Sequence, residues 1–120
     1  KAYERLMLLL ERINPNRFLI SKVEANMNSL ELHGTLLRDI RREYEHNLSQ
    51  QIYMSQKSWE AVVKGKEETI KLINIASGKV SAEASAMDLA QTVLAVAAQL
   101  TELPTKPSID LIKKEIAKEF

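Results

Sequence analysis

The chain has 120 residues, enough for one domain, and 45% of them are apolar. It contains no cysteine, which excludes disulfides, thiolate metal sites and a cysteine nucleophile, and which slightly favours the cytoplasm without fixing the compartment. Seventeen basic residues balance sixteen acidic ones, so no nucleic-acid-binding surface is predicted. The chain has only three glycines and three prolines, and because sheets need turn residues this composition predicts an all-α fold.

The first predicted helix covers Ala2–Ile13. Apolar residues recur there at three- and four-residue spacing, which indicates an amphipathic helix. The pattern ends at Asn14-Pro15, since proline disfavours helical backbone in the residue before it. Pro15 suits the first turn of a following helix, with Asn14 as its N-cap.

A stretch of about sixty residues, Arg17–Ser77, contains no proline and predicts one long central helix. Gly34 falls on its apolar face, where a neighbouring helix could approach closely. As one continuous helix it would span about 90 Å. Its apolar residues form a seam at helical spacing: Ile20, Val23, Met27, Leu30, Leu37, Ile40, Tyr44, Leu48, Ile52, Trp59, Val62 or Val63, Ile70 and Ile73.

Two points in this stretch are weak. The first is His46–Ser49, because asparagine and serine compete for local hydrogen bonds. The second is Gly65, because glycine costs about 1 kcal/mol against alanine inside a helix. The long helix is therefore expected to be either continuous or broken near Gly65 or His46. Gly78 marks its end.

Two shorter helices are predicted after this stretch. One covers Ala82–Leu103, is capped by Ser81 and carries many alanines, so it fits between other helices. The last covers Ile109–Phe120 and is capped by Ser108. The sequence thus predicts an elongated bundle in which three shorter helices pack on one long central helix. The chain starts without methionine and ends inside a helical pattern, so we expect residues 1–120 to be a single domain cut from a longer protein.

No metal, cofactor or catalytic site is predicted. Glu43 and His46 form the Glu-x-x-His step that helical di-iron sites use, but such a site needs a second step of this kind and two further glutamates. Leu30 stands where the other histidine, His33, would need its glutamate. A surface turn is the favoured interpretation of Glu43 and His46.

Three other features have a structural and a functional interpretation. His33 on an amphipathic helix could serve a phosphotransfer bundle, although a histidine without special role is commoner. Trp59 lies on the apolar seam, so core packing is favoured over a binding anchor. The cluster of Arg38, Arg41 and Arg42 is interleaved with acidic residues, which favours a solvated, ion-paired face over a lipid or partner site.

Five short runs stand out within the predicted helices: Ser-Lys-Val-Glu-Ala at 21–25, Ser-Leu-Glu at 29–31, Leu-Leu-Arg-Asp at 36–39, Glu-Glu-Thr-Ile-Lys at 67–71 and Val-Ser-Ala at 80–82. Together these runs resemble the helical segment of the toxic anion resistance (tellurite-resistance-associated) proteins. Ile40 stands where that family continues with asparagine. The resemblance implies a helical stress protein, and it implies no catalytic residue.

The favoured function is a non-enzymatic interaction or assembly module of a larger protein, because long amphipathic helices suit helix-to-helix recognition. A protein partner or self-association is expected, without nucleic acid and without an evident small molecule. The alternatives are a membrane-active helical toxin or secretion component that inserts residues 82–103, a toxic-anion-resistance protein, and the phosphotransfer bundle through His33.

Overall fold

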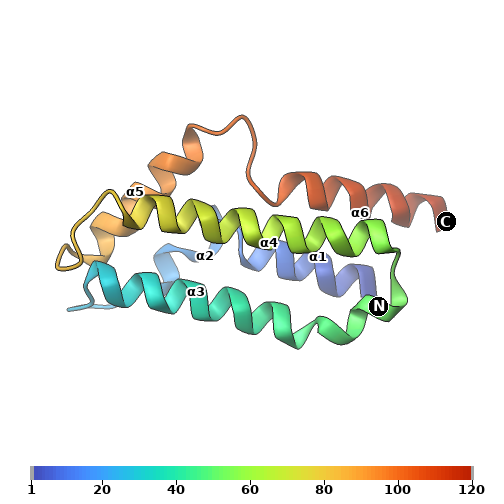
Figure 1. Cartoon of the computed structure of the whole chain (residues 1–120), viewed down its shortest axis with the longest axis horizontal. Helices are drawn as coiled ribbons and strands as arrows, with labels where there is room; N and C mark the ends of the chain where they lie inside the picture. Colours follow the sequence, from blue (N-terminus) through green and yellow to red (C-terminus); the bar gives the residue numbers. More distant parts are fainter. Residues whose placement is uncertain (1, 120) are drawn as a thin grey trace.

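The computed structural model describes residues 2–119, and within this range it contains helices and no β-strand. The molecule is elongated, with extents of 49 × 28 × 18 Å, and the predicted all-α fold is confirmed. Six α-helices and two 3₁₀ helices follow one another (Figure 1): α1 Ala2–Arg12, α2 Pro15–Phe18, η1 Ile20–Lys22, α3 Ser29–His46, η2 Leu48–Tyr53, α4 Gln56–Ser77, α5 Ala86–Ala98 and α6 Lys106–Glu119.

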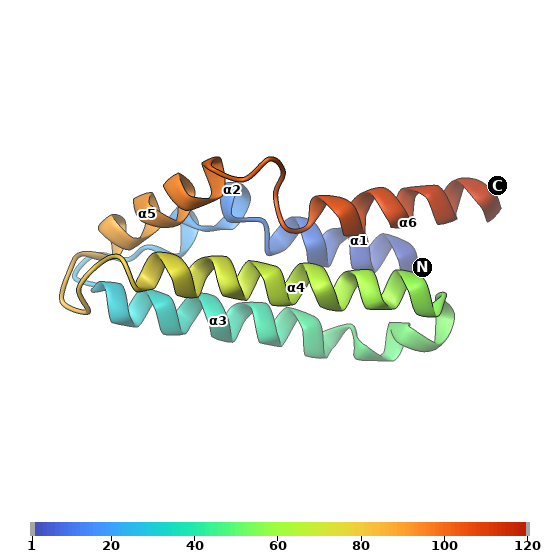
Figure 2. The same cartoon turned by 45° about the horizontal axis from the view of Figure 1, so that its top comes forward.

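The stretch Arg17–Ser77 is not one helix. It contains α3 and α4, which lie antiparallel and side by side (Figures 1 and 2), so that Nε2 of His33 lies 2.7 Å from Oδ1 of Asn74. The predicted break near His46 is confirmed, since α3 ends there. The alternative break at Gly65 is wrong, because Gly65 lies inside α4.

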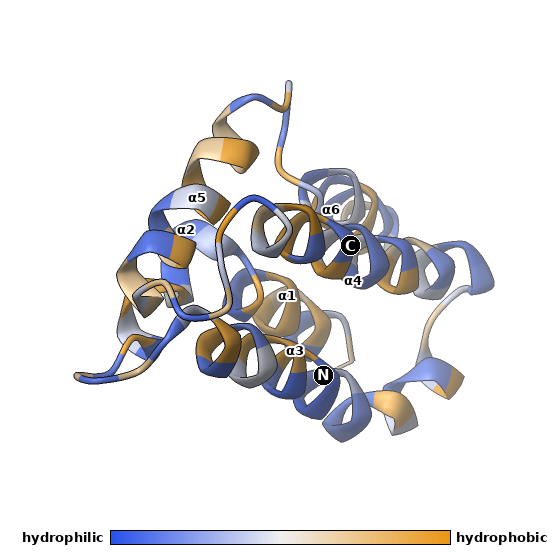
Figure 3. Ribbon diagram, turned by 60° about the vertical axis from the view of Figure 1, so that its left-hand side comes forward, coloured by the Kyte–Doolittle hydropathy of each residue, from blue (hydrophilic) through white to orange (hydrophobic). Residues whose placement is uncertain are grey.

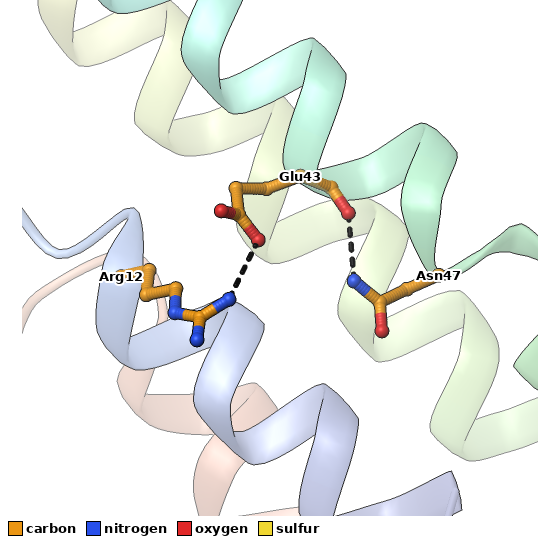
Figure 4. A network of polar contacts seen from close by, with 3 residues as sticks. All are labelled: Arg12, Glu43 and Asn47. Atoms are coloured by element: carbon orange, nitrogen blue, oxygen red, sulfur yellow. Dashed lines mark hydrogen bonds and ion pairs between the residues drawn. The ribbon is translucent and has the colours of Figure 1, made fainter.

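Two side chains, one at the end of α3 and one at the start of α4, explain why the chain reverses direction between these helices. Asn47 directly follows the last residue of α3, and its side-chain amide donates to the backbone carbonyl of Glu43 at 2.8 Å (Figure 4). This hydrogen bond caps the C-terminal end of α3. Ser55 accepts from the backbone N–H of Ser58 at 3.0 Å and begins α4. The segment between these caps is the short helix η2.

Helix α4 lies at the centre of the molecule and packs against α1, α3, α5 and α6. Figure 2 shows α5 near its C-terminal half and α6 near its N-terminal half. The apolar faces of α1, α3 and α4 meet in the interior (Figure 3). The buried core draws on five helices: Leu6, Leu9 and Leu10 of α1, Leu32, Leu36 and Ile40 of α3, Trp59, Val62 and Ile73 of α4, Leu89 and Val93 of α5, and Ile112 of α6.

The predicted seam is correct in α4 and partly wrong in α3. Leu30 is 61% exposed, whereas Leu32 and Leu36 are fully buried and form the actual core face together with Ile40. The helical phase changes because residues 23–28 are not helical and α3 starts afresh at its N-cap, Asn28. A seam drawn through this irregular segment therefore selects the wrong residues.

The three predicted shorter helices are present as α1, α5 and α6, with corrected ends, and the structure adds the short helix α2. Helix α1 and the Asn14 cap of α2 agree with the sequence, whereas α5 begins at Ala86 with Ser85 as N-cap instead of Ser81. The reason is that Ala86 donates to the Met27 carbonyl at 3.0 Å, which holds this segment extended beside the start of α3.

Helix α6 begins at Lys106, so Ser108 lies inside it rather than capping it. Its hydroxyl is buried and donates to the carbonyl of Ala61 on α4. A Cβ added to Gly65 would lie 2.8 Å from Oγ of Ser108 and 3.5 Å from Leu10, so Gly65 allows α6 and α1 to approach α4. This is the close approach that the sequence assigned to Gly34, and that assignment is wrong: Gly34 is exposed, and a Cβ there would meet nothing within 4 Å.

The two glycines therefore make a matched pair for measurement by urea denaturation. Gly65→Ala should lower the free energy of unfolding by about 1–3 kcal/mol through overpacking. Gly34→Ala should raise it by up to about 1 kcal/mol, because alanine is the better helix former. Ser108→Ala should shrink the penalty of Gly65→Ala, since it removes the closest atom. Equal effects of the two glycine substitutions would contradict this packing.

Candidate functional site

His33 lies between α3 and α4 and both of its ring nitrogens are engaged. Nε2 is 2.7 Å from Oδ1 of Asn74, and Nδ1 is 3.1 Å from Oγ of Ser77. A phosphotransfer histidine needs one ring nitrogen open to the phosphoryl donor, so these contacts would have to break. The geometry therefore suits a bridge between two helices, and phosphotransfer stays a prediction that the arrangement does not favour.

Glu43 and His46 have different surroundings near the end of α3. Glu43 pairs with Arg12 across the α1–α3 interface, and His46 is exposed at the end of α3. Among residues 2–119 no group of three or more histidine or acidic side chains is placed to hold a metal ion.

Trp59 is 5% exposed and belongs to the core, as the sequence favoured. Its ring centroid lies 5.6 Å from that of Tyr44, and Nζ of Lys66 lies 3.9 Å from the centroid of the Tyr44 ring. These contacts join α3 to the first half of α4. Trp59 thus stabilises the hairpin and offers little surface to a ligand.

A groove of about 450 Å³ runs between the end of α1, the segment around η1, and α3. Ile13 and Ile40 are buried beneath it, and Leu8 at its edge is 49% exposed. This volume falls in the range of small ligand sites. Seven charged side chains surround the apolar floor: Arg12, Arg17, Lys22, Arg42, Glu11, Asp39 and Glu43.

The carboxylates in this groove are paired with its cations. Arg12 approaches Glu43 at 3.3 Å (Figure 4), and Asp39 is shared by Lys22 at 3.0 Å and Arg42 at 3.6 Å. Four cations face three carboxylates, which leaves the groove net positive. The sequence did not predict it, because it forms only where three separate segments pack together.

The second exposed feature is the apolar tip of η2, made of Leu48, Ile52 and Tyr53. Ile52 is 79% exposed, Tyr53 67% and Leu48 43%. The sequence assigned Leu48 and Ile52 to the internal seam, which is wrong, because the reversal at Asn47 turns this segment away from the core. Exposed apolar surface outside the core commonly marks an interaction site, and these three side chains are exposed within the six residues of η2.

Glu115 of α6 joins three helices near the start of α1. Its carboxylate accepts from the Tyr3 hydroxyl at 2.9 Å and from the Ser55 hydroxyl at 2.5 Å. The hydrogen bond from Ser55 lowers the pKa of Glu115, burial partly opposes this by raising it, and the Tyr3 hydroxyl and the charge of Lys118 lower it further. Serine before an amphipathic run could have indicated the Ser55 cap, whereas nothing in the sequence pairs Tyr3 with Glu115.

A family model of unknown function, DUF7935, matches residues 1–119. The chain belongs to this family. Neither the curated proteins nor the solved structures include a match to the chain. These comparisons do not bear on the toxic anion resistance proteins, so that resemblance stays a prediction.

The Glu115 network predicts a pH-dependent contribution to stability. Because the pKa of folded Glu115 lies below its ordinary value, its charge stabilises the fold at neutral pH, and this contribution is lost as the pH falls from the ordinary glutamate pKa through the lowered folded pKa. Glu115→Gln should lower the free energy of unfolding by about 0.5–1.5 kcal/mol at neutral pH, measured by urea denaturation.

The difference between wild type and Glu115→Gln should shrink in acid. Glu83→Gln, in the exposed segment before α5, is the matched control and should change little at either pH. A difference that stays constant from neutral to acid pH would show that the Glu115 charge does not contribute.

Proposed function

We propose that this chain is a non-enzymatic helical interaction module of a larger protein and that it holds a protein partner at the η2 tip. The single observation that supports this function is the exposure of Leu48, Ile52 and Tyr53 on one short segment. Burying such side chains releases about 25 cal/mol for each Å² of apolar surface removed from water. Tyrosine also brings a polar hydroxyl, which suits a surface that is wet before binding and buried afterwards.

The position of the tip supports the same function. It lies between the caps at Asn47 and Ser55, which fix both of its ends to rigid helices. A short segment fixed in this way loses little conformational freedom on binding, so more of the interaction energy appears as affinity. The helices themselves use their apolar faces to form the core, which makes the tip the stronger candidate for contact with another protein.

A membrane role receives less support from the helices. Within residues 2–119 no helix is both long and apolar enough to cross a bilayer. In α5, the centre of the segment expected to insert, Leu89, Ala90 and Val93 are buried against the rest of the bundle. Insertion would require this helix to leave the core.

Site-specific photo-crosslinking in the cells that make the protein tests the proposed function. A photoreactive residue at Ile52 should give a discrete protein adduct, and the same residue at Leu100 should not. Leu100 is the control because it is an exposed apolar residue, at 44%, that lies in the segment after α5 and outside the tip. The substitution Tyr53→Ser should weaken the adduct at Ile52 while changing the free energy of unfolding by less than about 0.5 kcal/mol.

Equal adducts from positions 52 and 100 would contradict the role of the tip, as would an adduct that Tyr53→Ser leaves unchanged. Liposome flotation of the same protein gives the membrane alternative its own readout, because a lipid-binding tip would float and yield no protein adduct.

A further inference from the structure

The arginines of the chain are concentrated around the groove between α1 and α3. Of six arginines in the sequence, Arg12, Arg17 and Arg42 line the groove and Arg38 and Arg41 lie on the same helix as Arg42. Of the ten lysines within residues 2–119, Lys22 alone lines it. A guanidinium presents a planar fork of donors that fits a carboxylate in two-point contact, which lysine cannot provide.

These guanidinium groups retain donors after their internal ion pairs are made. A guanidinium carries five N–H donors. Arg12 uses one nitrogen on Glu43, and Arg42 approaches Asp39 through one nitrogen at 3.6 Å. Arg17 is 4.0 Å from Glu11 and its side chain is 66% exposed. The side chains of Arg12, Arg17 and Arg42 are between 61% and 66% exposed, so their remaining donors are accessible to a second anion.

The groove pairs this charge with exposed apolar surface. Leu8 is 49% exposed although its neighbours on α1, Leu6 and Leu9, are buried. It stands on the rim, next to the floor formed by Ile13 and Ile40. A ligand that fits must therefore carry both anionic groups and an apolar group.

We propose that this groove binds an acidic segment of a partner protein, with separate carboxylates on Arg12, Arg17 and Arg42 and an apolar side chain against Leu8. This assignment names a second contact for the interaction module proposed above and rests on that function. Carboxylates spaced along a peptide can each meet a different arginine and avoid the groove's own acids.

The interleaved acids argue against other anions. Asp39 and Glu43 lie among the arginines and would repel the concentrated charge of a phosphate or of a nucleic-acid backbone. Ile13 and Ile40 are 1% exposed, so the apolar surface that the groove offers to a ligand is Leu8, which matches a single apolar side chain. A peptide with alternating acidic and apolar residues satisfies both the charges and the shape.

Fluorescence anisotropy with a labelled peptide of alternating glutamate and leucine tests the assignment. The peptide should bind, and its affinity should fall as salt is added, since exposed charges are screened. A peptide with glutamine in place of each glutamate should bind much more weakly. Arg42→Ala and Arg12→Ala should each weaken binding about three- to tenfold.

Arg5→Ala is the matched control, because Arg5 is an exposed arginine of α1 outside the groove, and it should leave the affinity unchanged. Leu8→Ser should weaken binding while leaving its salt dependence intact. Circular dichroism of each variant verifies that the fold is retained.

Equal binding of the glutamine peptide would overturn the assignment, as would an equal loss with Arg5→Ala. Displacement of the peptide by inorganic phosphate, or binding to phosphatidylserine vesicles with the same dependence on Arg12 and Arg42, would assign the groove to phosphate or to lipid instead. If the peptide does not bind but Ile52 gives a discrete protein adduct, the groove assignment is wrong and the interaction module at the tip stands. If the peptide binds but Ile52 gives no adduct, the assignment of the partner to the tip is wrong.

Discussion

The fold depends on the close approach that Gly65 permits at the middle of α4. Because no side chain stands there, Ser108 of α6 can reach the Ala61 carbonyl while Leu10 of α1 packs on the same spot. Helix α4 contacts four other helices, and the absence of a side chain at Gly65 lets α1 and α6 lie close to it. Glycine normally weakens a helix interior by about 1 kcal/mol, and here the packing of α1 and α6 offsets that cost.

The α3–α4 hairpin depends in turn on local capping. The Asn47 side chain caps the end of α3 by donating to the Glu43 carbonyl. The Ser55 hydroxyl caps the start of α4 and also donates to the Glu115 carboxylate. These short-range hydrogen bonds fix the length of the connection, and that length leaves the η2 tip outside the core. The most exposed apolar side chains therefore follow from the way the two helices are ended.

Local features of the fold could be predicted from the sequence, and features set by packing could not. Helix α1, the Asn14 cap and the burial of Trp59 follow from spacing and residue type, and the structure agrees with them. The close approach was assigned to Gly34 and a possible break to Gly65, whereas Gly65 makes the close approach and both glycines lie inside helices, because a single sequence does not reveal which helix faces which glycine.

The groove and the Glu115 network also arise from packing between segments that are far apart in the sequence. The groove needs α1, η1 and α3 to meet, and the pair Tyr3–Glu115 joins residues separated by 112 positions. The exposure of the η2 tip could not be predicted for another reason. Leu48 and Ile52 continue the apolar spacing of the helix before them, so periodicity alone assigned them to the core. Only the reversal at Asn47 separates them from it.

Distance measurement by electron spin resonance tests the hairpin most directly. The chain has no cysteine, so cysteines introduced at the exposed positions Gly34 and Lys71 would be the only sites for spin labels. The antiparallel arrangement of α3 and α4 predicts a distance of roughly 20 Å or less, since packed helices lie about 10 Å apart. A distance near 55 Å, which a continuous helix would give at about 1.5 Å per residue, would contradict the antiparallel packing of α3 and α4.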